Sequence, residues 1–441
     1  MQLQADAKKR KFRNQVANQK GVVLIIIVLT LVMGTIVFII SQLDGNGLKI
    51  ERDKKTSAAL AEAKRALLGY SFGVNLSIAG RRPGDLPCPD NYPLGHINEG
   101  TSGSIAGTTC NLNALGRLPW KTLGIADLRD GSGERLWYAV STNYKNNTRT
   151  NCTTTNTAGC LNSDTNGTIN LRNASGTIIN DGTNSSAAIA VVIAPGSPLQ
   201  RQDNLVQNRT LTNYNAASHY LDNTATEDNS DFVDSGSNGF INGEIKNAAQ
   251  QITVNDKMIA ISKQDLMPLL EKRVANEVLR CMNAYAAAPV TGAVGTYPWP
   301  AKLNSALPPL YAGTPNNFFG RVPSSPMGGS WSGSCSIAAS GVVGWWLNWR
   351  EVVFYAIADG FKPTASIPAC GSCLAVSPPS VAADKRIAVM VGGQKILLQV
   401  RISNFDKGNL NNYLEPPNNA GSVLFAQSTS TPMFNDIVGY R

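Results

Sequence analysis

The segment that most constrains this chain is Val22 to Leu43, which reads VVLIIIVLTLVMGTIVFIISQL. It contains no charged side chain, and as a helix it would cover the hydrocarbon core of a bilayer, which is roughly 30 Å thick. The residues before it carry six basic side chains against the single acid Asp6. Because basic flanks stay on the cytoplasmic side, the sequence predicts one transmembrane helix, with the N-terminus inside and the rest of the chain outside.

The junction before the apolar segment carries a second signal. A secretory signal peptide would have a shorter apolar region followed by small residues, whereas here Lys20 and Gly21 stand in front of it. This arrangement resembles the leaders of type IV pilins and of the pseudopilins of type II secretion. The resemblance implies a leader at 1–21, cut after Gly21 by a prepilin peptidase that methylates Val22, and a transmembrane or filament helix at 22–43. It also implies other pilins or pseudopilins as partners through this helix.

One position departs from the family. Subunits that fill the body of such filaments usually carry Glu at the fifth mature position, which is Ile26 in this sequence. In this respect the chain resembles the large tip pseudopilin and the PilX-like minor pilins. We therefore expect a subunit at or near a filament tip.

The formal net charge of +9 does not indicate a nucleic-acid-binding protein. The chain holds 39 basic and 30 acidic residues, and residues 1–21 account for six of the former and one of the latter. The remainder is nearly balanced, so the basicity belongs to the membrane flank. No specific nucleic-acid partner is predicted.

Eight cysteines follow the apolar segment, and an even number in an exported region indicates disulfides. Eight cysteines allow 105 pairings, and local closure favours Cys88–Cys110, Cys152–Cys160 and Cys370–Cys373, which leaves Cys281 for Cys335. Cys370 and Cys373 also have the spacing of redox motifs, but they lie in a Pro-rich loop and not at the start of a helix. A structural disulfide is the prediction for this pair.

The region after the apolar segment reads as a helix followed by strands and loops. Asp44–Gly47 contains two glycines and predicts a hinge, after which an amphipathic helix runs from about Leu48 to Tyr70. Gly116–Trp120 reads as a turn. Residues 141–186 are dominated by Asn, Thr, Ser and Gly and predict a long exposed loop.

A repeat begins near Leu266, where a second helical pattern appears. Six short blocks recur in the same order at offsets of about 200 residues; they include Trp137-Tyr138-Ala139 with Phe354-Tyr355-Ala356, and Tyr220-Leu221-Asp222 with Tyr413-Leu414-Glu415. The predicted fold class is α+β: a long N-terminal transmembrane helix followed by two tandem pilin-like units, each a helix on an antiparallel sheet. The predicted units are 48–262 and 263–441.

Signals for chemistry are few. The chain has only two histidines, His96 and His219, both in polar loops, and it has no phosphate-binding loop and no HExxH motif. Gly69–Gly73 matches a nucleophile elbow but lacks the required strand before it. Four tryptophans, Trp331, Trp345, Trp346 and Trp349, predict core packing, with an exposed sugar-binding patch as the weaker alternative.

One acidic loop could hold calcium, because hard cations prefer several carboxylates on a flexible loop, and the resemblance to pseudopilins implies the same. The candidate ligands are Asp222, Glu227, Asp228, Asp231 and Asp234. A solvated acidic loop is the alternative.

Together these features predict a structural subunit and not an enzyme. It is a minor pilin or minor pseudopilin, anchored once in a bacterial inner membrane with its ectodomain in the periplasm, and assembled at or near the tip of a type IV pilus or type II secretion pseudopilus. Two alternatives stay open. One is a tip adhesin that binds a surface or ligand, and the other is an anchored periplasmic enzyme or sensor that never assembles.

Overall fold

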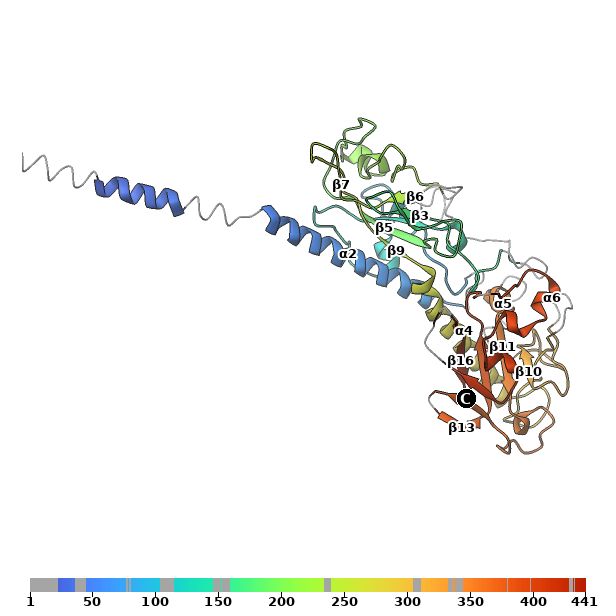
Figure 1. Ribbon diagram of the computed structural model, residues 1–441. Coiled ribbons are helices and arrows are strands. Elements are labelled where there is room, and N and C mark those ends of the chain that lie inside the picture. Colours follow the sequence, from blue (N-terminus) through green and yellow to red (C-terminus); the bar gives the residue numbers. More distant parts are fainter. Residues whose placement is uncertain are drawn as a thin grey trace, which may run out of the picture. The chain divides into compact units, whose positions relative to one another are not determined.

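The computed structural model describes most of the chain after residue 22 (Figure 1). The described residues are 23–35, 45–76, 78, 81–103, 115–145, 152, 159–233, 239–303, 311–331, 335, 337, 344–378, 380–396, 398–427, 431 and 433–441. They divide into two compact units, 1–57 and 58–441.

The N-terminal region corrects the predicted fold class. Residues 23–35 are helical, and helix α2 spans Gly45–Gly73, with 36–44 outside the described residues. Among the residues that the structure describes, no helix is both long and apolar enough to cross a membrane. The long transmembrane helix is therefore not part of the described fold. The predicted hinge is also wrong in part, because Gly45 and Gly47 belong to α2.

The second part of α2 is amphipathic, as its spacing predicts. Ala59, Leu60, Ala63 and Leu67 are buried in the core of the compact body 58–441. Side chains on other faces of the helix, such as Arg65, are exposed. Spacings of three and four residues place the buried set on one face, so this face joins the helix to the globular part.

A four-stranded antiparallel sheet follows α2 in the first half of this body, which we define as residues 58–262. Its strand order is β1-β2-β5-β9, with bounds β1 (Leu115–Arg117), β2 (Trp137–Val140), β5 (Ala190–Ala194) and β9 (Lys257–Ile261). Strands β2 and β5 are buried along their whole length, as continuous apolar runs with both faces covered.

The second half, residues 263–441, contains a sheet with the matching strand order β10-β11-β14-β16, also antiparallel. Its strands are β10 (Phe319–Arg321), β11 (Val353–Ile357), β14 (Ile387–Val391) and β16 (Ile437–Tyr440). The registers agree as well: Tyr138 lies opposite Val192 in the first sheet, and Tyr355 lies opposite Val389 in the second. The second half thus repeats the strand arrangement of the first.

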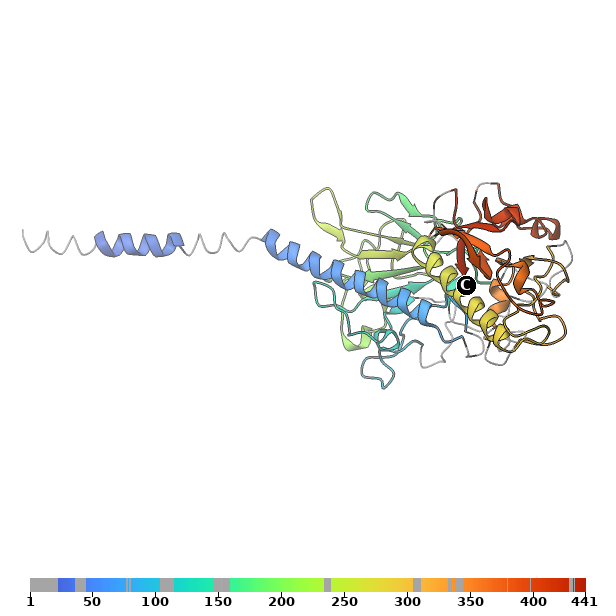
Figure 2. The same ribbon diagram turned by 90° about the horizontal axis from the view of Figure 1, so that it is seen from below.

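Helix α4 (Lys263–Ala287) opens the second half and packs on β14 and β16 (Figures 1 and 2). Ser262 and Asp265 cap its N-terminus reciprocally, since each side chain accepts a hydrogen bond from the other's backbone N–H. Its buried face contains Leu266, Leu270, Val274, Val278, Cys281 and Tyr285.

The smaller sheets are not purely antiparallel, which is a further correction. In the first half, β3 (Asn170–Arg172) pairs antiparallel with β4 (Ile178–Asn180) but parallel with β6 (Gly239–Ile241). In the second half, β12 (Leu374–Ser377) pairs antiparallel with β13 (Ser380–Lys385) and parallel with β15 (Leu424–Ala426). A two-stranded sheet joins β7 (Ile245–Lys246) to β8 (Ile252–Val254).

Short helices complete the described elements. The α-helices are α3 (Trp120–Leu123), α5 (Trp345–Trp349) and α6 (Asn404–Lys407), and the 3₁₀ turns are η1 (Thr142–Tyr144), η2 (Leu211–Asn213), η3 (Ala217–His219), η5 (Asp359–Phe361), η6 (Leu410–Asn412) and η7 (Asn418–Ala420). The turn predicted at Gly116–Trp120 is wrong, because β1 and α3 occupy it. The polar stretch 141–186 is only partly exposed, since Leu161, Ile169 and Leu171 are buried.

Candidate functional site

Three disulfides join described cysteines: Cys152–Cys160, Cys281–Cys335 and Cys370–Cys373. Cys152–Cys160 and Cys370–Cys373 are pairs that local closure favours in the sequence, and Cys281–Cys335 is the pair that it leaves. Cys88 is also disulfide-bonded, and Cys110 lies outside the described residues. None of the described cysteines is free. The predicted processing residues, Gly21 and Val22, also lie outside the described residues.

The predicted calcium ligands do not converge on one point. Asp222 is buried, whereas Glu227 pairs with Arg172, Asp228 pairs with Arg201 and Asp231 is exposed. Asp234 lies outside the described residues. In the part of the chain that the structure describes, no group of three or more His, Cys, Asp or Glu side chains could hold a metal ion. The calcium prediction failed here because arginines distant in sequence take up two of the carboxylates.

Asp222 instead faces a second buried carboxyl, Asp256. One Asp222 oxygen accepts from Gln207 Nε2 at 2.9 Å, and the other accepts from the Asn255 backbone at 2.7 Å. The backbone N–H of Asp222 and the amide of Asn229 both donate to Asp256 Oδ2, each at 2.8 Å. Burial raises the pKa of Asp222 to about 6, and burial beside Asp222 raises the pKa of Asp256 well above its ordinary value.

The second half contains the same arrangement with Glu415 and Asp436. Gln399 Nε2 donates to Glu415 at 2.8 Å, while the Glu415 N–H and the Asn418 amide donate to Asp436 Oδ2 at 2.9 and 3.0 Å. Burial beside Glu415 raises the pKa of Asp436 well above its usual range. Within the described structure, the Oδ1 atoms of both Asp256 and Asp436 are buried without a hydrogen-bond partner.

An arginine clamps the chain beside each carboxyl pair. Each guanidinium donates to several backbone carbonyls and to one glutamine. Arg209 donates to the carbonyls of Pro195, Gly196, His219 and Tyr220 and to Gln207, and Arg401 donates to the carbonyls of Gly393, Asn412 and Tyr413 and to Gln399. The bonds to backbone carbonyls satisfy acceptors that would be costly to bury without a partner. The clamps therefore fix the Tyr-Leu-acid blocks of the two halves in the same way.

A second arginine in each half lies within an aromatic cage. Arg117 lies 4.4 Å from the ring centre of Trp137 and 4.1 Å from that of Tyr220. Arg321 is likewise 5.0 Å from Phe354 and 4.9 Å from Tyr413. Cation–π contacts stabilise both buried guanidinium groups. The aromatic cages are therefore filled by the protein's own arginines and are not ligand sites.

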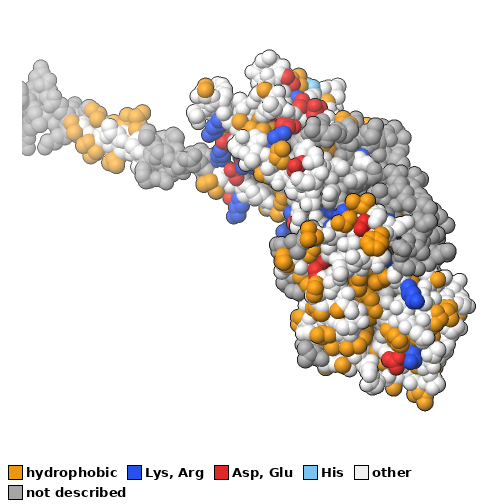
Figure 3. Space-filling model, turned by 45° about the vertical axis from the view of Figure 1, so that its right-hand side comes forward, with side chains coloured by type: hydrophobic (Ala, Val, Ile, Leu, Met, Phe, Trp, Pro, Cys, Tyr) orange, Lys and Arg blue, Asp and Glu red, His pale blue; other side chains and the backbone are white. Residues whose placement is uncertain are grey.

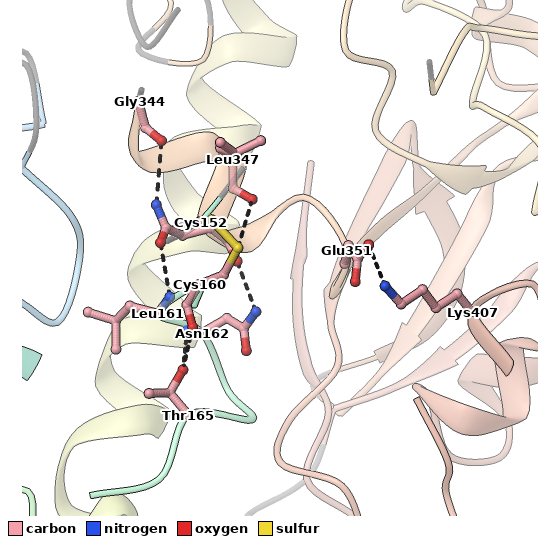
Figure 4. Close-up of a disulfide and its surroundings, with 10 residues drawn as sticks. Cys152, Cys160, Leu161, Asn162, Thr165, Gly344, Leu347, Glu351 and Lys407 are labelled. Atoms are coloured by element: carbon pink, nitrogen blue, oxygen red, sulfur yellow. Dashed lines mark hydrogen bonds and ion pairs between the residues drawn. A yellow bond between two sulfur atoms is a disulfide. The ribbon is translucent and has the colours of Figure 1, made fainter. Parts of the chain in front are cut away.

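A cavity of about 410 Å³ lies where the halves meet, and Cys160 of the Cys152–Cys160 disulfide is among its lining residues. Figure 4 shows the adjoining contacts: Leu161 N–H donates to Asn348 Oδ1, and Asn162 donates to the Asn348 carbonyl, both at 2.9 Å. The carbonyl of Leu347 lies within 3.9 Å of Cys160 Sγ. These contacts join the segment after β2 to helix α5.

Charged side chains line or underlie this cavity. Arg401 pairs with Asp164 at 3.1 Å, and Lys407 pairs with Glu351 at 3.3 Å. Below them, burial lowers the pKa of Lys263 to about 8 and raises that of Glu271 to about 7. The cavity is polar, and the Arg401–Asp164 ion pair connects the two halves.

The remaining candidates pack or bond internally. Trp331, Trp345, Trp346 and Trp349 are all buried, as predicted for core residues, so none is available for an exposed sugar-binding patch. The Nδ1 atoms of His96 and His219 accept backbone N–H groups of Asn98 and Asn208. Ser71, the centre of the elbow-like motif, is buried inside helix α2.

Sequence reasoning missed the two arginine clamps and Asp256 and Asp436. A signal existed, because Arg209 and Arg401 each follow a glutamine by two residues and precede the repeated Tyr-Leu-acid block. Comparison with protein-family models, curated proteins and solved structures finds no match.

Proposed function

We propose that the chain is a pilin-like structural subunit, a minor pilin or minor pseudopilin, cleaved after Gly21. The observation that carries the proposal is the junction Lys20-Gly21-Val22, where a basic leader meets twenty-two uncharged residues. The apolar segment would hold the chain at the bacterial inner membrane and later among neighbouring pilins or pseudopilins. Its ectodomain would lie in the periplasm, which the disulfides support because they persist in oxidising compartments.

The features of the compact body fit a structural domain carried by a filament better than they fit an enzyme. Its buried polar groups are used for holding chain segments: the arginine clamps, the carboxyl pairs and the contacts around Asn348. Ile26, where filament-body subunits usually have Glu, favours a position at or near the tip. Whether the filament is a pilus or a secretion pseudopilus stays open.

The test is N-terminal mass spectrometry of the chain after co-expression with a prepilin peptidase. We expect a mature chain that begins at Val22, with an N-methyl group. A Gly21→Val variant is the matched control and should keep residues 1–21. If the native chain also keeps them, the pilin proposal is overturned.

Two other functions, a tip adhesin and an anchored periplasmic enzyme or sensor, predict different results. A tip adhesin would need a ligand-binding surface, which the buried tryptophans do not supply. An anchored periplasmic enzyme or sensor would keep its leader uncut in the experiment above.

A further inference from the structure

An exposed apolar loop distinguishes the second half of the molecule. We define the apolar loop as residues 398–405. The exposed fractions of its four apolar side chains are large: Leu398 93%, Val400 42%, Ile402 82% and Phe405 78%. On the face shown in Figure 3, hydrophobic side chains also reach the surface of the second half at several places. Singly exposed apolar residues are common, but four within eight residues indicate a contact surface.

Hydrogen bonds and an ion pair fix the apolar loop to the rest of the compact body. Gln399 and Arg401 point inward to Glu415 and Asp164. The Val400 N–H donates to Asn412 at 3.2 Å, and Ser403 and Asp406 cap helix α6 at the end of the loop. Leu398, Val400 and Ile402 therefore alternate with the anchored residues Gln399 and Arg401 and are themselves exposed. Ile402 also lies at the rim of the cavity between the halves.

The first half shows that the fold does not require all of these apolar residues, although it keeps an exposed Val206 (64%) where the second half has Leu398, and an exposed Leu211 (77%) nearby. Gln207 and Arg209 make the same inward contacts as Gln399 and Arg401. The exposed positions between and after them are Asn208 and Thr210, where the second half has Val400 and Ile402. Since the same framework stands with polar residues at these two positions, we infer that Val400 and Ile402 contact something outside the chain.

The charges around the loop identify the occupant. Lys395 is exposed before the loop, and Asp406 stands at its other end with its side chain near the surface. A two-fold axis through Val400 would set Lys395 of one copy against Asp406 of the other and stack the apolar side chains between them. Two-fold contacts need such self-complementary patches.

We propose that the apolar loop is the contact surface for a second copy of this chain, paired by two-fold symmetry about Val400. The contact is small, so it is a weak association that gains from tethering both copies to one membrane or assembly. It lies wholly in the compact body and does not depend on the cleavage proposed above. An anionic lipid surface is disfavoured as occupant because Asp406 would be repelled.

The test uses cysteine cross-linking of the full chain in membranes. Val400→Cys would place a thiol on the proposed axis, and Asn208→Cys is the matched control at the corresponding exposed position of the first half. Since no described cysteine is free, the added thiol is the reactive one. We expect a covalent dimer from Val400→Cys and little from Asn208→Cys. Maleimide labelling of both thiols in detergent checks that each variant is folded with its thiol accessible.

Two further changes probe the chemistry in the Val400→Cys background. Lys395→Glu should lower the dimer yield about tenfold, because both symmetric ion pairs become repulsive. Ile402→Thr, the residue that the first half carries, should lower it as well. Equal cross-linking at positions 208 and 400 overturns the proposal. So does protection of the position-400 thiol by phosphatidylglycerol vesicles without a cross-link, which would assign the loop to a membrane.

Discussion

The first and second halves of the compact body share their internal framework but differ in how they are fastened. Both have a four-stranded antiparallel sheet, an arginine clamp and a buried carboxyl pair. The second half adds the Cys281–Cys335 disulfide between α4 and a distant loop, at a sequence separation of 54. Its clamp also pairs with Asp164 of the first half. The buried polar contacts are therefore common to both halves, whereas the disulfides and surface residues differ between them.

The largest expected effect concerns the disulfides. Replacing Cys281 and Cys335 by Ser should lower the free energy of unfolding by about 4 kcal/mol, because closing a long loop restricts the unfolded chain strongly. The same change at Cys152 and Cys160, eight residues apart, should cost about 2.5 kcal/mol. Urea unfolding followed by tryptophan fluorescence measures both. Equal losses would show that loop length does not set the difference between the halves.

The arginine clamps should give the next largest effect. Arg401→Gln should destabilise the protein by about 3 kcal/mol, since it leaves buried carbonyls and Asp164 without their partner. Arg209→Gln should cost about 1 kcal/mol less, because its partner Glu134 lies in the same half and is partly exposed. The readout is again urea unfolding. If Arg209→Gln proves the costlier change, the interface between the halves is not what Arg401 stabilises.

The carboxyl pairs predict a pH dependence common to both halves. The pKa of Asp256 is raised in the folded state, so folding binds a proton between the ordinary pKa and the folded one. Its contribution to stability is present at low pH and is lost as pH rises through that window. Asp222, Asn229 and Arg209 are the groups that face it or act on it.

Asp256→Asn removes the charge and should therefore flatten this dependence. We expect a higher melting temperature than the native chain at about pH 8 and a similar one at about pH 4. Asp436→Asn should behave alike in the second half. Thermal melts across this range check both variants, and a native melting temperature that rises steadily from acid to neutral pH would contradict the prediction.

The sequence predicted those parts of the fold that local patterns dictate. The helical pattern that begins near Leu266 predicted α4. Cys152–Cys160 and Cys370–Cys373 followed from their short separations in sequence, and Cys281–Cys335 was the pair left over.

What failed depends on contacts between residues far apart in sequence. Strand β1 was read as a turn because three residues form a strand only when β2 lies alongside. The calcium site failed because Arg172 and Arg201 occupy Glu227 and Asp228. The predicted transmembrane helix rested on apolar length alone, and the described helical residues do not include that length.

The smallest expected effect tests how the two helices meet their sheets. Lys64 of α2 donates to the Ala260 carbonyl at 3.0 Å and pairs with Asp265 at 2.9 Å. At the corresponding place in the second half, Leu279 of α4 lies against Gly439. Since the Lys64 ion pair is partly exposed, Lys64→Leu should cost about 1 kcal/mol or less, and added salt should shrink that cost. A salt-independent loss would mean that Lys64 acts by packing its stem, as Leu279 does, and that the charge adds nothing to the contact.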